Sequence, residues 1–353
     1  MSIAANADGT PVSPALTQTE LALIAERLVS AGEAVHAPLQ AGLIAGGRSN
    51  LTYRLTDGIT TWVMRTPPRV GRTPSAHDVA REYRVTRALA ATGVPVARPV
   101  ALCEDESLIG GPFAIAEFVP GRTIQKRSEL DELDDRTVDA IAGDLVATLA
   151  RLHRVDHVAV GLAPSGRPGS YAQRQLRRWS GQWELIATPD VHSLGVKLST
   201  RLSAAVPVQR ATSIVHGDYR IDNTLLAIDS PPPRVLAVVD WELSTIGDPV
   251  ADVAMMCAYR QPYFDRIVGE PSAWTSTRLP GIEDLAGRYA DAGGAALADW
   301  DFHLALAYFK VAAIAAGIDH RRRAGAAAGS GFDTAGESVE PFLRLGLEQL
   351  KGF

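Results

Sequence analysis

Residues 214–224 read IVHGDYRIDNT, and this stretch decides the fold. A pair of β-branched residues opens it, a His-Gly-Asp triplet ending at Asp218 follows, and Asn223 comes five residues after Asp218. The chain then returns to apolar residues at 225–228. A surface loop needs no such order of polar side chains after a strand, and the pattern favours a loop that handles phosphate. A carboxylate in the position of Asp218 is able to accept a proton from an attacking hydroxyl group.

A second motif, VVDWE, follows the apolar run 235–239 and places Asp240 just past a predicted strand. Asp240 offers a charged oxygen and Asn223 a neutral one, a pair that suits magnesium better than zinc. Structural alternatives exist, because Asp218 and Asn223 are good turn residues and Asp240 is a good helix cap. The occurrence of both motifs in one chain, each after a β-like run, favours the chemical interpretation.

The stretch GGRSNLTYRL at 46–55 carries two glycines that lead into a predicted strand, with Ser49 and Asn50 at the turn. Glycine allows backbone N–H groups to approach phosphate oxygens closely, which makes Gly47, Ser49 and Asn50 candidate nucleotide-binding residues. The order differs from a Walker A loop, which requires Gly-Lys-Ser/Thr at the start of a helix. Taken alone, the stretch is a weak signal and fits an ordinary hairpin turn better.

Arg65 and Glu82 form the next candidate pair. Arg65 ends a predicted strand and Glu82 lies in the helix predicted after it. A cation on the strand is able to hold the α and β phosphates of a nucleotide while the helix carboxylate orients it. Two unrelated surface charges are the alternative. The position of the pair after the glycine-containing turn favours the first interpretation.

The first 120 residues or so predict a small antiparallel sheet with helices. Thr17 and Glu20 fit a capping box that opens an amphipathic helix reaching about residue 29. Asp57-Gly58 is a hairpin signal between two strand-like runs. The predicted strands are 50–56, 61–65, 96–102 and 113–119, and a helix is predicted over 75–91.

The remainder of the chain is predicted to be mainly helical. Helical periodicity covers 134–153, 170–188 and 194–206, short strands surround 213–239, and helices return after Pro249. The Gly/Ala-rich segment 324–338 fits either a lid or a loop. We therefore predict an α+β protein with a loose tail at 1–16, a nucleotide-binding lobe at 17–119 and a helical lobe at 120–353 that carries the catalytic and acceptor sites.

Composition limits the classes of function. The net charge of −5 argues against a general nucleic-acid binder, because binding to a phosphate backbone requires a basic surface. Cys103 and Cys257 are the only cysteines and have neither disulfide-framework nor zinc spacing. Residues 1–20 show no signal peptide, and the apolar stretch 304–318 contains Lys310 and is too short to span a bilayer. We expect a cytoplasmic protein without a nucleic-acid or membrane partner.

Taken together, the motifs resemble a known family. HGDYRIDN (216–223) followed by VDWE (239–242) and GDPVADVA (247–254) resembles the aminoglycoside phosphotransferase family of the protein-kinase-like fold. The resemblance extends over roughly 40–350 and includes GGRSNLTY, WVMR, REYRVTRAL and AEFVPGRT. It implies a two-lobed fold with a small antiparallel β-sheet lobe and a larger, mainly helical lobe, and it implies binding of ATP, with GTP as the alternative, and Mg²⁺.

The resemblance also assigns roles to residues. Asp218 matches the catalytic-loop aspartate, and Asn223 and Asp240 match the magnesium ligands. The backbone of Glu117 and Val119 matches the hinge segment that binds adenine.

Two further residues complete the comparison with the family. Arg65 stands where the family has its phosphate-binding lysine, and Glu82 stands at that lysine's helix partner. Arginine at 65 departs from the pattern, since its planar fork differs from a compact ammonium, although it still binds phosphates bidentately. Arginine at this position, GGRSNLTY and the stretch at 169–183 together look most like the kinase-like domain of acyl-CoA dehydrogenase family members.

The stretch at 169–183 leaves two interpretations open. It places Arg174, Arg177 and Arg178 close to Trp179 and Trp183. This mixture suits an acceptor with an anionic and an apolar part, such as a CoA-linked acyl group. A solvated basic helix face is equally consistent. Aminoglycosides are polycations and would prefer an acidic pocket.

Other polar residues of the second lobe are expected to be structural. Asp248 and Asp252 are expected to brace the loop after Asp240 and to cap the following helix. His216 is expected to hold the Asp218 loop by hydrogen bonding, and His153 is expected to face the core of a helical region.

The resemblance implies an ATP-dependent phosphotransferase that moves the γ-phosphate to a hydroxyl group of a small molecule. A hydroxyacyl-CoA or another metabolite is favoured as acceptor over an aminoglycoside. The alternative is a kinase-like, nucleotide-binding module that is catalytically weak or silent. The arginine at position 65 favours this alternative. A metal-dependent hydrolase built on His216 and Asp218 is disfavoured, because no second His–carboxylate cluster in the sequence has metal spacing.

Overall fold

A computed structural model of the protein describes residues 15–45, 50–68, 78–163, 169–325 and 331–351. The chain divides into two compact units. The first consists of Met1–Pro120 together with Val239–Glu242, and the second of Gly121–Val238 and Leu243–Phe353. The predicted α+β class is confirmed, because a five-stranded antiparallel sheet belongs to the first unit and the second is mainly helical.

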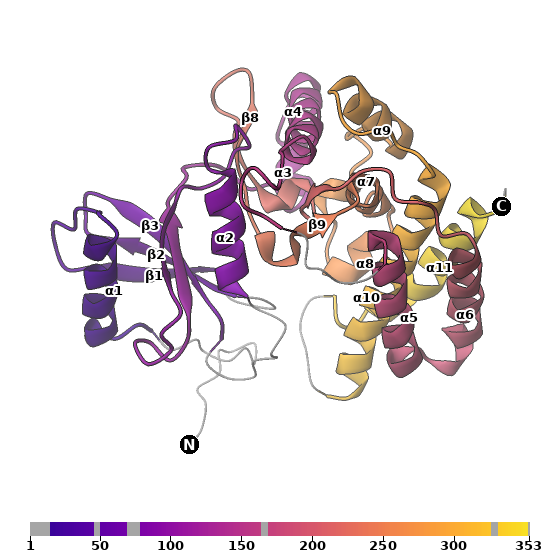
Figure 1. The fold of residues 1–353 in the computed structure, drawn as a ribbon, viewed down its shortest axis with the longest axis horizontal. Coiled ribbons are helices and arrows are strands. Elements are labelled where there is room, and N and C mark those ends of the chain that lie inside the picture. Colours follow the sequence, from indigo (N-terminus) through magenta and orange to yellow (C-terminus); the bar gives the residue numbers. More distant parts are fainter. Residues whose placement is uncertain (1–14, 46–49, 69–77, 164–168, 326–330, 352–353) are drawn as a thin grey trace. The chain divides into compact units, whose positions relative to one another are not determined.

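The first unit is a sheet with two helices (Figure 1). The sheet has the strand order β1-β2-β3-β5-β4, and every neighbouring pair is antiparallel. Its elements are α1 (Gln18–Ser30), β1 (Gln40–Ala45), β2 (Leu51–Thr56), β3 (Thr61–Thr66), α2 (Val79–Leu89), β4 (Pro99–Cys103) and β5 (Phe113–Glu117).

Local sequence signals account for several boundaries in this unit. The Thr17–Glu20 capping box begins α1: the Glu20 N–H donates to Thr17 Oγ1 (3.2 Å), and the Thr17 N–H donates to Glu20 Oε2 (2.7 Å). The β2–β3 hairpin turns at Asp57, whose Oδ1 accepts the N–H groups of Ile59 (2.9 Å) and Thr60 (2.7 Å).

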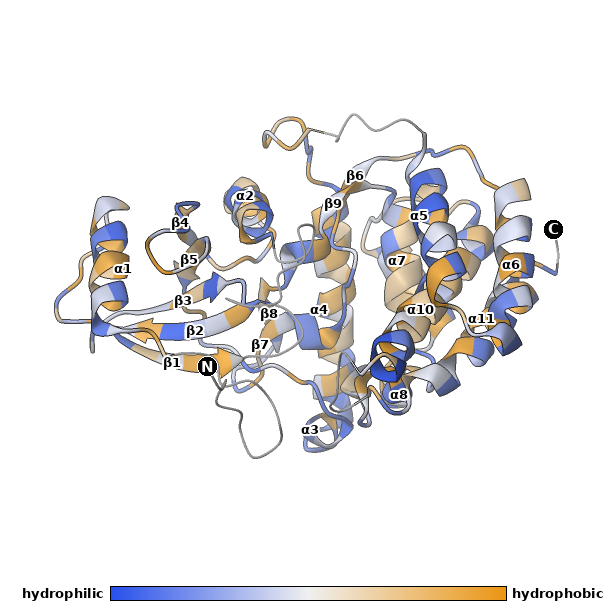
Figure 2. Cartoon of the chain, turned by 90° about the horizontal axis from the view of Figure 1, so that it is seen from below, coloured by the Kyte–Doolittle hydropathy of each residue, from blue (hydrophilic) through white to orange (hydrophobic). Residues whose placement is uncertain are grey.

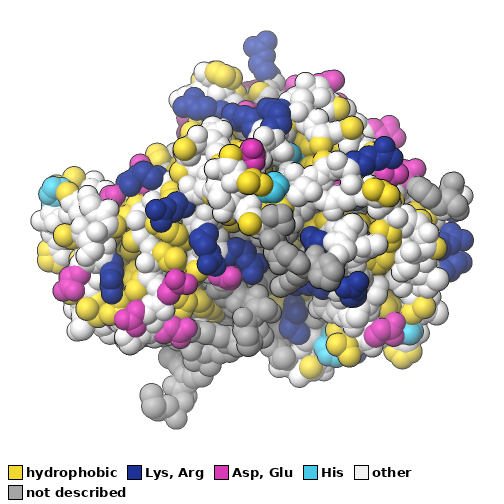
Figure 3. Space-filling model, viewed as in Figure 1, with side chains coloured by type: hydrophobic (Ala, Val, Ile, Leu, Met, Phe, Trp, Pro, Cys, Tyr) yellow, Lys and Arg dark blue, Asp and Glu magenta, His cyan; other side chains and the backbone are white. Residues whose placement is uncertain are grey.

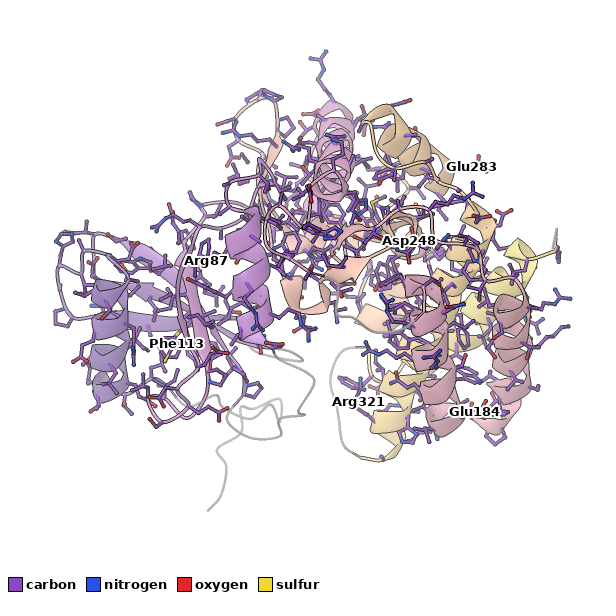
Figure 4. All side chains as sticks on the ribbon, in the orientation of Figure 1. Arg87, Phe113, Glu184, Asp248, Glu283 and Arg321 are labelled. Atoms are coloured by element: carbon purple, nitrogen blue, oxygen red, sulfur yellow. The ribbon has the colours of Figure 1, made fainter. Side chains whose placement is uncertain are left out.

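The core of the first unit lies between α1 and one face of the sheet. Leu21, Ile24 and Leu28 of α1 pack with the buried residues of the strands, which alternate along β2, β3 and β5. Phe113, labelled in Figure 4, is fully buried in this cluster. Helix α2 contacts β4 and β5. The sheet therefore fixes the direction in which residues at the ends of β3 and β5 project.

Strand β1 was not predicted. It pairs only with β2, at the edge of the sheet, and its residues are mostly exposed, including Leu43 and Ile44. An edge strand with both faces open to solvent lacks the alternation of apolar and polar residues by which strands are recognised in a sequence.

The second unit contains most of the helices. Its helices are α3 (Arg127–Asp131), α4 (Asp135–His153), α5 (Tyr171–Ile186), α6 (Pro189–Ala204), α7 (Pro249–Ala258), α8 (Phe264–Val268), α9 (Ile282–Asp291), α10 (Trp300–Arg323) and α11 (Val339–Gln349). Short strands form two antiparallel pairs, β6 (Ser213–Val215) with β9 (Thr245–Gly247) and β7 (Thr224–Ala227) with β8 (Arg234–Val238). Of the Gly/Ala-rich segment, 326–330 lie outside the described residues, and 335–338 form a 3₁₀ turn.

Helices α7 and α10 lie at the centre of the second unit. Both are apolar around most of their circumference and are drawn largely in orange and white tones in Figure 2, and they pack against each other. Helix α10 has 24 residues, more than the apolar stretch 304–318 predicted. By length and composition it is able to cross a membrane, but 83% of its apolar window is buried within the protein, as in a core helix.

Candidate active site

Asp218 lies in a loop between β6 and a 3₁₀ turn at Ile221–Asn223. Its Oδ2 accepts hydrogen bonds from Arg220 Nη2 (3.0 Å) and Asn223 Nδ2 (3.1 Å), and the same Asn223 Nδ2 donates to the Asp218 backbone carbonyl (2.7 Å). The structure thus brings the predicted base and one predicted magnesium ligand together within one loop. The side chain of Asp218 remains 19% exposed, so it is accessible to a substrate.

The loop needs glycine at 217. Gly217 has φ of 84°, and a Cβ atom there would approach the carbonyl oxygen of Leu243 to 3.0 Å. A left-handed residue at this point turns the chain out of β6 and aims the next side chain away from the strand. The Asp218 N–H donates to Nδ1 of the buried His216 (3.3 Å), as predicted for a histidine that holds this loop.

Asp252 of α7 anchors the same loop through two backbone hydrogen bonds. Its Oδ2 accepts the His216 N–H (2.6 Å), and its Oδ1 accepts the Gly217 N–H (2.7 Å). One carboxylate therefore satisfies the two backbone donors that precede Asp218, and charge-assisted bonds of this kind are the stronger ones. Asp252 was expected to brace the loop after Asp240, but it lies against the loop before Asp218 instead.

His153 completes this buried network. Its Nε2 lies 3.1 Å from Asp252 Oδ2, and its Nδ1 lies 2.7 Å from the Tyr289 hydroxyl. Burial raises the pKa of the Asp252 carboxyl, but the hydrogen bond and charge of His153 and the interactions with His216 outweigh it and hold the pKa below its ordinary value. His153 was predicted to face a core, which it does, but its bond to a carboxylate 99 residues away was not predictable.

Asp248 has the capping role that was predicted for it. It is the N-cap of α7, accepts the Val250 N–H (3.0 Å) and is buried; it is labelled in Figure 4. His303 Nε2 lies 3.8 Å from its carboxylate.

In the first unit, Arg65 joins Glu82 and Asp240. Its Nη1 donates to Glu82 Oε1 (2.5 Å), and its Nη2 donates to Asp240 Oδ1 (3.1 Å). Glu82 projects from α2 and is 7% exposed, while Arg65 projects from the end of β3. The forked guanidinium allows one residue to bridge two carboxylates, which a lysine ammonium does less rigidly.

Asp240 is held in a conformation that is uncommon for an aspartate. Its φ is 65°, and the following Trp241 N–H donates to Glu82 Oε1 (3.2 Å). Burial raises the pKa of Glu82 to about 7, because its Arg65 partner offsets only part of the desolvation and Asp240 and Glu242 add negative charge. Left-handed backbone at a non-glycine residue is a strained state of the kind found at functional sites.

Two predicted nucleotide-binding residues, Gly47 and Ser49, lie outside the described residues. Asn50 is described and is 5% exposed, and neither its amide nitrogen nor its amide oxygen has a hydrogen-bond partner within the described ranges. A buried amide without partners is costly unless a ligand or water satisfies it. This orphaned amide fits the prediction that Asn50 contacts a nucleotide.

One of the two predicted hinge residues, Glu117, already makes hydrogen bonds to a neighbouring residue of the first unit. The Glu117 N–H donates to the Arg98 carbonyl (2.9 Å), and the Glu117 side chain pairs with Arg98 Nε (2.9 Å). A nucleotide base that contacts the Glu117 backbone would therefore have to donate a hydrogen bond to the Glu117 carbonyl oxygen. For Val119 the backbone contact with adenine stays a prediction.

The donor set fits magnesium rather than a metal caged by protein. In the part of the chain that the structure describes, no group of three or more His, Cys, Asp and Glu side chains has the geometry to hold a metal ion. Magnesium usually takes one or two protein oxygens and completes its shell with phosphates and water. Asn223 uses its amide nitrogen on Asp218, which leaves the amide oxygen for a cation. Asp240 and Asn223 belong to different units, so their joint binding of one ion stays a prediction.

Helix α5 carries both arginines and tryptophans, and the Arg178 guanidinium lies over the Trp179 ring, 5.2 Å from its centroid. Trp179 and Trp183 are buried, whereas Arg177 and Arg178 are exposed, and Arg174 donates to the Gly169 carbonyl (2.6 Å). Figure 3 shows both basic and acidic side chains spread over the visible face. The two interpretations of α5 therefore stay open.

A match with a protein family decides the identity of the fold. The model of the phosphotransferase enzyme family covers residues 41–305. The chain belongs to the phosphotransferase enzyme family. The resemblance of the HGDYRIDN, VDWE and GDPVADVA motifs to the aminoglycoside phosphotransferases is thereby confirmed.

Sequence relatives extend this family assignment. Acyl-CoA dehydrogenase family member 10 of Mus musculus is 37% identical over 303 residues, which are 85% of this chain and 28% of the relative. Acyl-CoA dehydrogenase family member 11 of Homo sapiens is 32% identical over 334 residues, which are 94% of this chain and 42% of the relative. The chain therefore spans less than half the length of these curated relatives. The predicted similarity to that branch is confirmed.

Solved structures of family members share the fold. A Ralstonia eutropha protein that is itself assigned only provisionally to the aminoglycoside phosphotransferases is 36% identical, with 96% of this chain and 98% of that chain covered and a TM-score of 0.79. Aminoglycoside phosphotransferase APH(4)-Ia is 14% identical, with 94% and 99% covered and a TM-score of 0.63. The second similarity concerns the fold alone.

Removing the Arg65 side chain of this family member should destabilise the protein. Arg65→Ala leaves the buried Glu82 without a counter-charge, and loss of one partner of a buried pair costs about 3 kcal/mol at the lower end of the usual range. Chemical denaturation measures the change in the free energy of unfolding. The double variant Arg65→Ala/Glu82→Gln should be more stable than Arg65→Ala, because it also removes the uncompensated carboxylate. Additive losses in the double variant would contradict the pairing.

Proposed function

We infer that the protein transfers the γ-phosphate of ATP to a hydroxyl group of a small molecule. The geometry of the loop around Asp218 supports this proposal best. The Asp218 carboxylate accepts hydrogen bonds from Arg220 and Asn223, and Asp252 holds the backbone before Asp218. Catalysis of phosphoryl transfer rests on positioning and electrostatics, so a rigidly held base is what the reaction requires. Membership of the phosphotransferase enzyme family supports the same reaction.

Each residue has a defined task in this proposal. Asp218 orients the acceptor hydroxyl and takes its proton as the phosphoryl group leaves ATP. Arg65, oriented by Glu82, binds phosphate oxygens. Asn223 and Asp240 would hold Mg²⁺, which neutralises charge on the β and γ phosphates. Asn50 and the backbone of Glu117 and Val119 would contact the rest of the nucleotide.

ATP is proposed as the donor, with GTP as the alternative. A thermostable mutant of APH(4)-Ia has been solved in a ternary complex with AMP-PNP and hygromycin B, and an aminoglycoside 2′-phosphotransferase-IIIa mutant with GDP, so both nucleotide classes occur on this fold. For the acceptor we favour a hydroxyacyl-CoA or another small metabolite. The acyl-CoA dehydrogenase family relatives support this choice, and aminoglycosides would require a more acidic site.

The test is ATP consumption with a panel of hydroxyacyl-CoAs, amino alcohols, sugars and aminoglycosides. We expect activity with at least one acceptor, and complete loss of that activity on addition of excess EDTA. Asn223→Ala should raise the Mg²⁺ concentration needed for half-maximal rate by about tenfold or more, because one ligand is lost. The exposed Asp229→Asn variant serves as control and should behave as wild type. Undiminished turnover in EDTA would contradict the proposed role of magnesium.

The second candidate is a nucleotide-binding module without turnover. The bond between Arg65 and Asp240 favours it, because it occupies a predicted magnesium ligand with a cation from the protein itself. Thermal stabilisation by Mg²⁺ and ATP without phosphoryl transfer to any acceptor would establish this candidate. Transfer to one acceptor would exclude it.

A further inference from the structure

Arg65 makes fewer hydrogen bonds with Glu82 than the two side chains allow. Its Nη1 donates to Glu82 Oε1 (2.5 Å), while its Nη2 donates to Asp240 Oδ1 (3.1 Å). Among the residues that the structure describes, the buried Arg65 Nε and Glu82 Oε2 have no hydrogen-bond partner. A buried donor and a buried acceptor without partners are costly, and here they belong to side chains that already touch. Arginine and carboxylate groups often meet through two parallel hydrogen bonds, so this single bond requires an explanation.

The contact with Asp240 explains why the Arg65–Glu82 pair has only one bond. One terminal nitrogen of Arg65 reaches Asp240, and the guanidinium then presents a single N–H group to Glu82. A rotation that pairs Nε and one terminal nitrogen with both Glu82 oxygens would satisfy the two unpartnered atoms and release Asp240. This rotation exchanges one charge-assisted hydrogen bond for another, so two pairings are open to Arg65 at small cost.

The two carboxylates differ in their exposure to solvent. The Glu82 side chain is buried, whereas 30% of the Asp240 side chain is exposed. A hydrogen bond to an exposed carboxylate competes with water and contributes less to stability than one to a buried carboxylate. The contact with Asp240 is therefore the one that breaks first, and the contact with Glu82 is the one that persists.

Asp240 keeps its position when its contact with Arg65 breaks. The backbone after Asp240, whose φ is 65°, is held by the Trp241 N–H, which donates to Glu82 Oε1 (3.2 Å). Glu82 thus anchors both the guanidinium and the segment that carries Asp240. Release of Asp240 from Arg65 leaves a carboxylate oxygen in place for a cation.

The charge of Arg65 competes with a metal ion for Asp240. Burial lowers the pKa of the guanidinium, but the charges of Glu82, Asp240 and Glu242 outweigh it and hold the pKa above its ordinary value. Arg65 is therefore charged in the protein without nucleotide. A divalent cation at Asp240 would lose the oxygen that Arg65 holds and would meet a positive charge beside it.

We propose that Arg65 exchanges between two pairings and thereby makes cation binding at Asp240 depend on nucleotide. Without nucleotide, Arg65 bridges Glu82 and Asp240. When phosphate oxygens bind the guanidinium, Arg65 turns to a two-bond pair with Glu82 and releases Asp240 for Mg²⁺. The five N–H groups of a guanidinium suffice for a carboxylate and a phosphate together. Arg65 is thus a positioning residue for a metal ligand, an inference that rests on the proposed phosphotransferase function and deepens it.

A fixed bridge accounts for less of this arrangement. A bridge that only stabilises the fold gives no reason for Arg65 Nε and Glu82 Oε2 to stay buried and unpartnered. It also predicts that ATP binding does not compete with Asp240 for the guanidinium. The exchange predicts that it does, and this difference is measurable.

The first experiment titrates the full chain with Mn²⁺ in the absence of nucleotide and follows free Mn²⁺ by electron paramagnetic resonance. It compares wild type with Arg65→Ala/Glu82→Gln, which removes the guanidinium and leaves the net charge unchanged. We expect the double variant to bind Mn²⁺ about tenfold more tightly, the lower end for a hydrogen bond to a charged group. Adding Asp240→Asn should abolish this gain. Arg65→Lys, whose ammonium bridges two carboxylates less rigidly, should lie between wild type and the double variant.

The matched control is Arg344→Ala/Glu340→Gln, which removes an exposed ion pair of α11 by the same two substitutions. It should bind Mn²⁺ as wild type does. Equal Mn²⁺ affinity of wild type and Arg65→Ala/Glu82→Gln would overturn the proposal, because Arg65 would not compete for Asp240. Should the double variant not fold, an Arg65→Lys affinity equal to that of wild type would overturn it instead.

The second experiment measures ATP binding by calorimetric titration in excess EDTA. Asp240→Asn should bind ATP about tenfold more tightly than wild type, because it frees the guanidinium for phosphate. The same substitution should have a smaller effect in Arg65→Ala/Glu82→Gln, where no guanidinium has to be freed. An equal gain in both backgrounds would overturn the exchange, since it would indicate only repulsion between ATP and Asp240.

Neither measurement requires phosphoryl transfer, so the proposal and the proposed reaction can fail separately. The expected changes in Mn²⁺ and ATP affinity would support the exchange even if no acceptor were phosphorylated. Turnover of an acceptor together with unchanged Mn²⁺ affinity in every Arg65 variant would overturn the exchange and leave the proposed reaction standing.

Discussion

Asp218→Asn should lower kcat by about 10²- to 10⁴-fold, the usual contribution of a positioned general base, and leave nucleotide binding unchanged. An asparagine side chain has the shape of aspartate and still offers an oxygen to Arg220 and Asn223, so the loop keeps its geometry. The amide cannot take the proton of the acceptor hydroxyl. The loss is therefore expected in the chemical step rather than in binding.

Single-turnover phosphoryl transfer and ATP titration together measure the two parts of this prediction. Asp229→Asn, which removes an exposed carboxylate 11 residues further along the same unit, is the matched control. Equal kcat for wild type and Asp218→Asn would remove Asp218 from the mechanism. A parallel loss of ATP affinity would indicate that the loop had changed shape.

Asp252→Asn should combine a loss of activity with a loss of stability. The amide accepts with one atom only, so one of the N–H groups of His216 and Gly217 would face an NH₂ group. His153 also loses its carboxylate partner. Removing one partner from a buried charged network costs about 3–5 kcal/mol. Because the loop before Asp218 is released, kcat should fall by about 10²-fold, as expected when a catalytic group is misplaced.

The pH dependence of this variant is distinctive. Because the pKa of Asp252 is held below its ordinary value in the folded protein, its stabilising contribution is present above the unfolded pKa of about 3.9 and is lost as pH falls through the folded pKa. The difference in free energy of unfolding between wild type and Asp252→Asn should therefore be largest near neutral pH and shrink below about pH 4. A difference that stays constant down to pH 3 would contradict the role of the charge.

Hydrogen exchange separates positioning from general destabilisation. The amide of His216 or of Gly217 should exchange faster in Asp252→Asn than in a variant of equal stability, because asparagine keeps an oxygen acceptor for only one of the two. The exposed Asp291→Asn variant at the end of α9 provides the control for substitution itself. Unchanged protection of both amides would exclude Asp252 as their anchor.

The parts of the candidate site that could be predicted are local in sequence. Asp218 and Asn223 lie on one short loop, so their spacing alone brings them together. Arg65 and Glu82 follow each other as strand end and helix, and the pattern of elements implied their pairing. Family resemblance supplied the rest of the assignment.

The parts that could not be predicted depend on backbone donors and on distant residues. Asp252 binds two backbone N–H groups more than 30 residues earlier in the chain, and no side-chain pattern encodes such a contact. In the sequence, Lys310 is recognisable only as a charge within an apolar helix, because its bond to Gly217 joins residues 93 positions apart.

Two elements of the fold were likewise not fully predictable from the sequence. The residues of β1 at 40–44 are all exposed, so the alternation of buried and exposed residues that reveals a strand is absent there. Helix α10 extends beyond its apolar centre to Arg323, because the polar residues of its last turns do not interrupt a helix whose middle is held by the core. For α10, packing of its middle against the core supports the helix more than the propensity of its last residues does.

The assignment of Val239–Glu242 to the first unit bears on the order of events during synthesis. Some 120 residues of the second unit leave the ribosome before Asp240 and Trp241 can reach Arg65 and Glu82. Until then the nascent first unit carries its guanidinium–carboxylate pair without the segment that completes it. A fragment ending at Pro120 should consequently be a poor autonomous folder, and supplying 239–242 in trans or by circular permutation should be what restores it.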